Sequence, residues 1–80
     1  MSLVELKLPD LGLGDLPIRV TGWLVDRGAA VLAGDPVVEV LCGNVTVDVP
    51  ANISGRLFEK KVDVDAVARP GEVLGVIERY

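Results

Sequence analysis

Histidine is absent from the 80-residue sequence, and cysteine occurs only once, as Cys42. Without histidine, the chain has no imidazole to act as a base or a metal ligand near neutral pH. A single cysteine excludes a disulfide bond within the chain and is typical of a reducing compartment. We therefore expect a cytoplasmic location.

Long apolar runs are also missing, because no stretch approaches the roughly 20 residues that a membrane-spanning helix needs. Residues 1–9 show neither the basic lead nor the apolar centre of a secretory signal. We expect no membrane association.

Aromatic residues and positive charge are scarce. Trp23, Phe58 and Tyr80 are the only aromatics, and 8 Lys and Arg against 12 Asp and Glu give a net charge of -4. The cations are scattered along the chain, whereas nucleic-acid binding calls for a basic patch, with aromatic platforms where the strand is single. Nucleic acid is therefore not an expected partner.

Half of the residues are hydrophobic, which in a chain of this length is enough for one core, so we expect a single domain over residues 1–80. A core of this size leaves only about 3–5 kcal/mol of net stability, which is little reserve for strained catalytic machinery. Binding or carrying is therefore favoured over catalysis, and we expect no enzyme activity and no catalytic residues.

Short blocks of Val, Ile and Leu are interrupted by Gly or Pro at intervals of roughly eight to twelve residues, which is the rhythm of an all-β fold. No segment has the periodicity of a helix. The expected strands are 3–8, 18–25, 37–42, 45–49, 56–61 and 73–78, with a shorter one near 30–32.

Gly43-Asn44 lies between two β-branched runs and predicts a two-residue hairpin turn with positive φ at its first position. One face of this hairpin would then be apolar, with Cys42 opposite Val45, Val40 opposite Val47 and Val38 opposite Val49. The other face would pair Leu41 with Thr46 and Glu39 with Asp48. The two facing carboxylates destabilise this pair slightly unless a cation lies nearby.

The sequence contains a near-repeat, in which Val20-Thr21-Gly22 is echoed by Ile53-Ser54-Gly55. Gly22 is followed by Gly34 after 12 positions and Gly55 by Gly71 after 16, which predicts a longer loop in the second half. Two similar β halves indicate a two-fold sandwich, with the Gly43-Asn44 turn at one end and both termini at the other.

The segment 8–14, Leu-Pro-Asp-Leu-Gly-Leu-Gly, resembles the Leu-Pro-Asp-Leu-Gly-Glu-Gly that opens the lipoyl domains of 2-oxo acid dehydrogenase acyltransferases. The match continues in order along the whole chain through Trp23-Leu24-Val25, Gly34-Asp35-Pro36, Glu39-Val40, Val47-Asp48-Val49-Pro50 and Val76-Ile77-Glu78.

The resemblance implies an all-β lipoyl/biotinyl (hammerhead) fold, a flattened sandwich of two four-stranded antiparallel sheets with quasi-two-fold symmetry. In that family a lysine within Asp-Lys-Ala at the hairpin tip is lipoylated, and the arm carries acyl groups between active sites. The implied partners are the other components of a 2-oxo acid dehydrogenase complex.

At the position of that motif the chain has Gly43-Asn44-Val45. The nitrogen of an Asn carboxamide is delocalised and is not a useful nucleophile, so we expect Asn44 to be unmodified and the chain to bind no lipoate. Biotin carriers share the fold but need a lysine at the same place. Lys7, Lys60 and Lys61 are expected in strands away from the tip.

Two leucines replace residues that are commonly Glu in the family: Leu13 in the first loop, which the family fold places beside the tip, and Leu41 in the hairpin. With Gly43 and Asn44 they form the expected contact surface, although scattered surface leucines would need no explanation. Three functions follow: contact with dehydrogenase components, self-association through Leu13 and Leu41, or an acyl carrier whose lysine has been replaced in this chain.

Two other candidate sites carry less weight. The hairpin register turns Cys42 toward the core, where a thiol is inert. Asp63 and Asp65 share one side of a possible strand but fall short of the roughly six oxygen ligands that a hard cation takes, so no metal site is expected.

Overall fold

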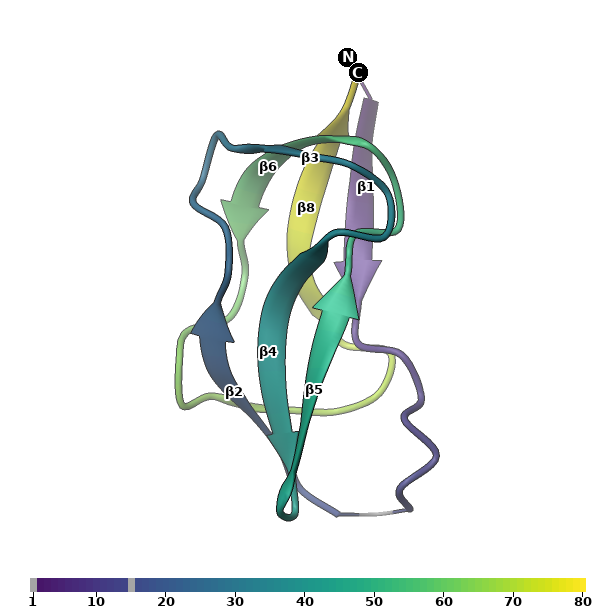
Figure 1. Ribbon diagram of the computed structural model, residues 1–80, viewed down its shortest axis with the longest axis vertical. Coiled ribbons are helices and arrows are strands. Elements are labelled where there is room, and N and C mark those ends of the chain that lie inside the picture. Colours follow the sequence, from purple (N-terminus) through teal and green to yellow (C-terminus); the bar gives the residue numbers. More distant parts are fainter. Residues whose placement is uncertain (1, 15) are drawn as a thin grey trace.

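The computed structural model describes residues 2–14 and 16–80. The described residues form eight strands and no helix, in two four-stranded antiparallel sheets (Figure 1). The strands are β1 (Ser2–Lys7), β2 (Ile18–Trp23), β3 (Ala30–Val31), β4 (Pro36–Cys42), β5 (Val45–Pro50), β6 (Gly55–Lys60), β7 (Val67–Ala68) and β8 (Val73–Arg79). Their order is β1-β8-β6-β3 in one sheet and β5-β4-β2-β7 in the other, which confirms the predicted fold class.

The predicted strands agree with the observed ones to within about two residues. The one described strand that the sequence pattern does not predict is β7, which has two residues. Val67 is exposed and Ala68 is buried, and one such alternation is too short a pattern to recognise as a strand. Pairing with the start of β2 places β7 in the sheet.

Apolar side chains from both sheets form a common core. The fully buried side chains include Leu6, Leu8, Val20, Val37, Val38, Val40, Leu57, Leu74 and Ile77. Burying one such aliphatic side chain stabilises a fold by about 1.5–3 kcal/mol. No polar or charged residue in the described parts of the chain is buried, so the core is held together by apolar packing.

The two halves of the chain repeat each other at an offset of 37 positions. β2 has a bulge after Val20 in its pairing with β4, and β6 has one after Leu57 in its pairing with β8. Gly28, with φ +92°, corresponds to Asp65, with φ +75°. This repeat confirms the quasi-two-fold sandwich.

The same offset corrects one part of the predicted repeat. Gly34 and Gly71 do correspond, but Gly22 corresponds to Glu59, and Gly55 to Ile18. The second half therefore has no longer loop. The extra residues lie in the first half, where 8–17 connect β1 to β2 while only 51–54 connect β5 to β6. The similar triplets at 20–22 and 53–55 predicted the wrong alignment of the two halves, because Gly22 and Gly55 are glycines for different structural reasons.

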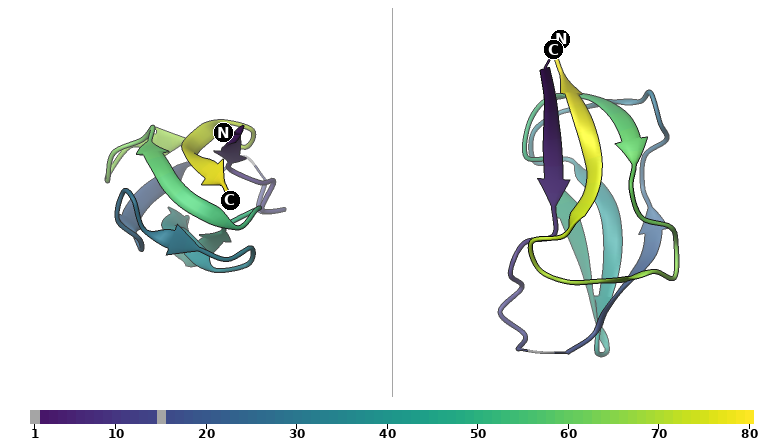
Figure 2. Two further views of the ribbon diagram at one scale, coloured as in Figure 1. Left: turned by 90° about the horizontal axis from the view of Figure 1, so that it is seen from above. Right: turned by 180° about the vertical axis from the view of Figure 1, so that it is seen from behind.

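The hairpin between β4 and β5 projects at one end of the molecule, and both ends of the described chain meet at the other (Figures 1 and 2). The long 8–17 connection runs down toward the hairpin tip in these views. The insertion that distinguishes the two halves therefore belongs to the tip end, as do the residues predicted to form the contact surface.

Candidate functional site

The tip of the β4–β5 hairpin consists of Gly43 and Asn44, and Cys42 pairs with Val45 across it. Gly43 has φ +63°, while Asn44 keeps a negative φ and is exposed. Positive φ at the first position alone is the pattern of a type II′ turn, which suits the twist of a hairpin. The predicted turn and all five predicted pairs of the register are confirmed.

The apolar face of the hairpin becomes exposed toward the tip. Val40 and Cys42 are buried, Val47 is partly buried, and Val45 is 45% exposed. The buried thiol of Cys42 confirms that this side chain turns inward. At the tip end of this face, the exposed side chain of Val45 is thus available for contact with other molecules.

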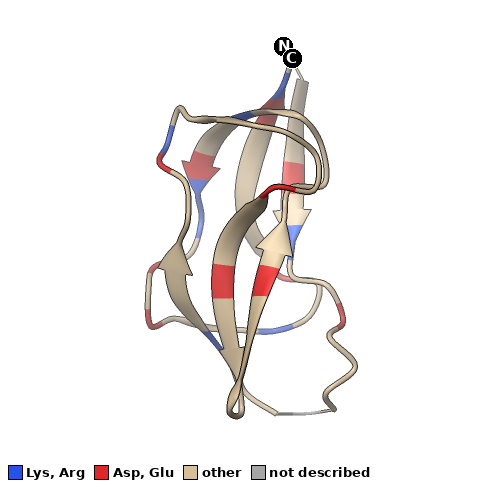
Figure 3. Cartoon of the chain, in the orientation of Figure 1, with Lys and Arg blue, Asp and Glu red and all other residues tan. Residues whose placement is uncertain are grey.

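Glu39 and Asp48 face each other across the hairpin, as predicted. Glu39 forms no ion pair with a described residue, but the hydroxyl of Thr21 donates a hydrogen bond of 2.8 Å to Glu39 Oε1. This hydroxyl comes from β2, on the side of β4 away from Asp48. The facing carboxylates lie well behind the turn, and residues 40–47 carry no charge, so the tip itself is uncharged (Figure 3).

The loop between β1 and β2 reaches the tip through Leu16. A Cβ atom on Gly43 would lie 3.3 Å from Leu16 Cδ1, so the leucine side chain covers the turn glycine. Asp10 shapes the start of this loop by accepting a hydrogen bond of 2.8 Å from the backbone N–H of Gly12, and buried Leu8 anchors it in the core. The residue beside Leu16, Asp15, lies outside the described residues.

The predicted contact residues are only partly brought together. Leu41 and Gly43 line one hollow of about 260 Å³ together with Pro17, Ile18, Arg19 and Val67. Asn44 is adjacent in the turn. Leu13 is 37% exposed and lies farther along the loop, outside this hollow.

Sequence reasoning missed two exposed residues of this surface, Leu16 and Val67, whose side chains are 51% and 59% exposed. Leu16 could have been found from its place next to Pro17 in the loop that the resemblance put beside the tip. The sequence around Val67 contains no pattern that indicates a contact surface, because only the pairing of β7 with β2 brings Val67 opposite Arg19.

The three lysines lie outside the hairpin turn. Lys7 ends β1, 3.9 Å from Glu5, and Lys60 ends β6 with its ammonium group 5.5 Å from the centre of the Trp23 ring. Lys61 follows β6 and forms a 2.9 Å ion pair with Glu59. None of them occupies a tight turn at a hairpin tip.

Within residues 2–14 and 16–80, no group of three or more His, Cys, Asp or Glu residues is arranged to hold a metal ion. Over the same residues, no helix is long and apolar enough to cross a membrane.

A sequence-family model of biotin- and lipoyl-bearing domains, described as "Biotin-requiring enzyme", matches residues 4–77. This chain belongs to the biotin–lipoyl family. The match runs from β1 into β8 and therefore includes both sheets and the tip.

Curated relatives within the family are acyltransferase components. The chain is 32% identical over 74 residues to the dihydrolipoyllysine-residue succinyltransferase component of the 2-oxoglutarate dehydrogenase complex of Bartonella vinsonii subsp. berkhoffii, covering 92% of this chain and 18% of that protein. It is 31% identical over 78 residues to the mitochondrial lipoamide acyltransferase component of the branched-chain alpha-keto acid dehydrogenase complex of Caenorhabditis elegans, covering 98% and 17%. The chain thus spans less than a fifth of the length of these relatives.

The fold is shared with solved structures, of which two are compared. Urea carboxylase of Kluyveromyces lactis superposes with a TM-score of 0.81 at 19% identity, over 98% of this chain and 6% of that one. The lipoyl domain of the 2-oxoglutarate dehydrogenase complex of Azotobacter vinelandii superposes with a TM-score of 0.67 at 22% identity, over 90% and 87%.

Proposed function

We propose that this chain is a lipoyl-like module of a 2-oxo acid dehydrogenase system that carries no lipoate and acts by protein contact. The observation that carries the proposal is the tip itself: an ordered, exposed hairpin turn formed by Gly43 and Asn44, without a lysine. Domains of this family are carriers rather than catalysts, and a carrier needs a nucleophilic amine at which to load its arm.

The chemistry of Asn44 supports the absence of an arm. Amide formation with an activated lipoyl group requires a free amine, and the carboxamide nitrogen of Asn44 shares its lone pair with the carbonyl. Lys7, Lys60 and Lys61 have amines, but none projects from a hairpin turn. Asn44 accordingly occupies the place of the attachment lysine and stays unmodified.

The surface around the turn supports a contact role. Leu16 covers Gly43, and Leu41 and Val67 line the adjoining hollow. Apolar side chains at the tip of a domain that projects from a larger assembly are suited to recognition by a second protein. The expected partners are the components of the dehydrogenase complex.

The first experiment asks whether the chain is ever lipoylated. It is co-expressed with a lipoate ligase in medium supplied with lipoate, and the intact mass is measured. We expect the unmodified mass, while a lipoyl domain with an Asp-Lys-Ala tip, expressed in the same cells, gains the lipoyl group. A lipoyl adduct on this chain would disprove the proposal.

The second experiment asks whether the tip makes contact. The ¹⁵N-labelled domain is titrated with the purified decarboxylase component of a 2-oxo acid dehydrogenase complex, and amide signals are followed by NMR. Signals of the turn and of Leu16 should shift or broaden first, and a Leu16→Asp variant should lose the effect. Leu3→Asp, which changes an equally exposed leucine near the termini, is the matched control.

Self-association is a second candidate function, favoured by the four exposed apolar side chains at the tip end: Leu13, Leu16, Val45 and Val67. Sedimentation velocity over a wide concentration range tests it. A concentration-dependent dimer that Leu16→Asp or Leu41→Asp abolishes would support this function, whereas a monomer at all concentrations would reject it.

The remaining alternative is a working carrier whose lysine has been replaced. It requires that Asn44→Lys be lipoylated efficiently by the same ligase. We expect little modification of this variant, because Gly43 and Val45 flank the new lysine in place of the Asp and Ala of the family motif.

A further inference from the structure

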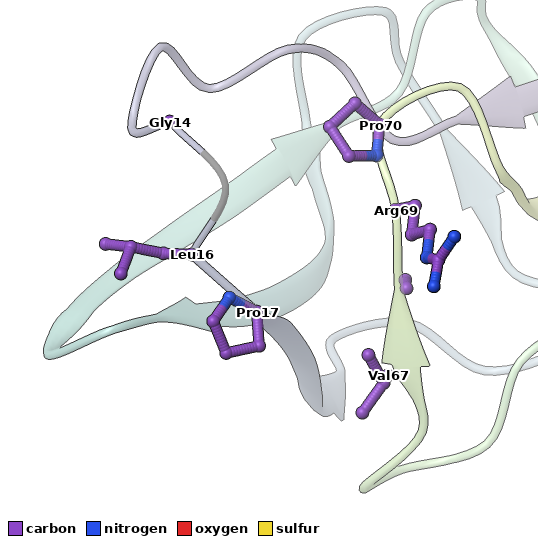
Figure 4. Close-up of a pocket in the computed structure, with 7 residues that line it drawn as sticks. Gly14, Leu16, Pro17, Val67, Arg69 and Pro70 are labelled. Atoms are coloured by element: carbon purple, nitrogen blue, oxygen red, sulfur yellow. The ribbon is translucent and has the colours of Figure 1, made fainter.

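A second hollow of the described surface lies beside the tip and not on it. It measures about 440 Å³ and is lined by Gly14, Leu16, Pro17, Val67, Ala68, Arg69 and Pro70. Figure 4 shows Leu16 and Pro17 on the β1–β2 loop and, across the hollow, Val67 and Pro70 on β7 and the segment that follows it. Pro17 and Val67 also line the smaller hollow next to Gly43, so the two hollows form one continuous surface.

Arg19 lies within this surface and between apolar neighbours. Its cross-strand partners are Leu41 on one side and Val67 on the other, so no carboxylate stands directly opposite it. Arg69 lies at the rim, with its guanidinium group turned away from Leu16 and Pro17 (Figure 4). Neither guanidinium group forms an ion pair with any residue that the structure describes.

Among the described residues that line the two hollows, the charged side chains are those of Arg19 and Arg69, although the net charge of the chain is -4. One carboxylate lies at the rim, where Glu72 Oε1 accepts a hydrogen bond of 3.2 Å from the backbone N–H of Arg69. Such a surface attracts carboxylates and offers aliphatic contact between them. A second copy of the chain is a poor match, because an isologous pair through this face would bring the arginines of both copies together.

We infer that this surface binds an extended peptide segment of another protein in which acidic and aliphatic side chains are interspersed. The aliphatic side chains lie against Leu16, Pro17 and Val67, and the carboxylates pair with Arg19 and Arg69. This inference rests on the proposed contact function and specifies the chemistry of the partner.

The test uses ¹⁵N-labelled protein whose intact mass is unmodified and a synthetic peptide, capped at both ends, in which Leu and Glu alternate. We expect saturable NMR shifts at Leu16, Arg19, Val67 and Arg69 at low ionic strength, which weaken as salt is added because exposed ion pairs are screened. A peptide in which Leu and Lys alternate should give no such shifts.

Charge-reversed variants decide whether the arginines matter. Arg19→Glu combined with Arg69→Glu should weaken binding about tenfold or more, since two attractive pairs become repulsive. Arg79→Glu, at the opposite end of the molecule in β8, makes the same change of charge per residue and should leave the affinity within about twofold. The dispersion of the amide signals shows whether each variant is folded. The double variant Arg19→Gln, Arg69→Gln removes both charges without reversing them and is a less disruptive test.

Three results would overturn the inference. They are the absence of saturable shifts, equal binding of the Leu–Lys peptide, and an affinity that is unchanged both in the Arg19→Glu, Arg69→Glu variant and in the Arg19→Gln, Arg69→Gln variant. A lipoyl adduct in the intact mass would instead overturn the proposed function. The two failures are therefore distinguishable.

Discussion

Gly43 and Asn44 have different roles in the hairpin turn. Gly43 supplies the positive φ that a tight hairpin requires, and its missing Cβ leaves room for Leu16. Asn44 has an ordinary negative φ and an exposed side chain, so the turn makes no demand on its identity. At the scale of single residues, the glycine is needed for the fold of the tip and the asparagine is free to determine its chemistry.

This difference predicts opposite sensitivities. Gly43→Ala should lower the free energy of unfolding by about 1–2 kcal/mol, because an L-residue is strained at φ +63°. Asn44→Ala should change it by less than about 0.5 kcal/mol, as is usual for an exposed residue without special geometry. Urea denaturation followed by circular dichroism measures both. Equal losses for the two variants would contradict this assignment of roles.

At the scale of strands, β2 and β6 occupy equivalent positions but use glycine for different reasons. Gly55 begins β6 directly against the backbone of β8, where a Cβ would overlap the carbonyl oxygen of Glu78. Gly22 lies in the bulged part of β2, and a Cβ there would have no neighbour within 4 Å. Of these two glycines, only Gly55 is required by the close approach of two strands.

Gly55→Ala should therefore destabilise the domain by about 3 kcal/mol or more, because two backbone segments must separate to admit the methyl group. Gly22→Ala, the matched substitution in the equivalent strand, should stay within about 0.5 kcal/mol of the parent. Thermal unfolding of the two variants side by side provides the measurement. A stable Gly55→Ala variant would mean that β6 and β8 lie farther apart than described.

The two-fold repeat makes a second prediction for the turns after β2 and β6. Asp65 has φ +75°, and glycine stands at the equivalent position 28. Asp65→Gly should relieve this strain and stabilise the domain by about 0.5–1 kcal/mol, while Gly28→Asp should destabilise it by about 1 kcal/mol. Chemical denaturation tests both signs, and a loss of stability in Asp65→Gly would show that its side chain has a role in the folded state.

At the scale of the whole molecule, the domain has one apolar core and two dissimilar ends. The end with the termini joins β1 and β8, while the other end combines the β4–β5 turn, the β1–β2 loop and β7. These three segments are far apart in sequence, and packing around the core places them side by side. The contact surface is therefore a property of the folded domain.

Cys42 reports on the integrity of that end, because its side chain is 1% exposed and lies next to the turn. A thiol reagent should label it at least about a thousandfold more slowly in the native domain than in urea, since reaction requires opening of the fold. Labelling kinetics measured with and without denaturant test this. Fast native labelling would indicate that the hairpin tip opens locally.

Much of the fold followed from local sequence. Alternation of β-branched residues predicted the long strands, Gly43-Asn44 predicted the turn and its register, and the absence of lysine at this turn was visible directly. These features depend on neighbours in the chain or on one pair of adjacent strands, for which local rules are sufficient.

The other features depended on contacts between distant segments. Only the tertiary structure distinguished the role of Gly55 from that of Gly22, placed Val67 opposite Arg19, and left Leu13 out of the hollow that Leu41 lines. The sequence by itself thus determined an all-β domain whose hairpin turn, Gly43-Asn44, contains no lysine. Packing of the two sheets decided which side chains surround that tip, because a contact surface built from three segments exists only after those segments have been brought together.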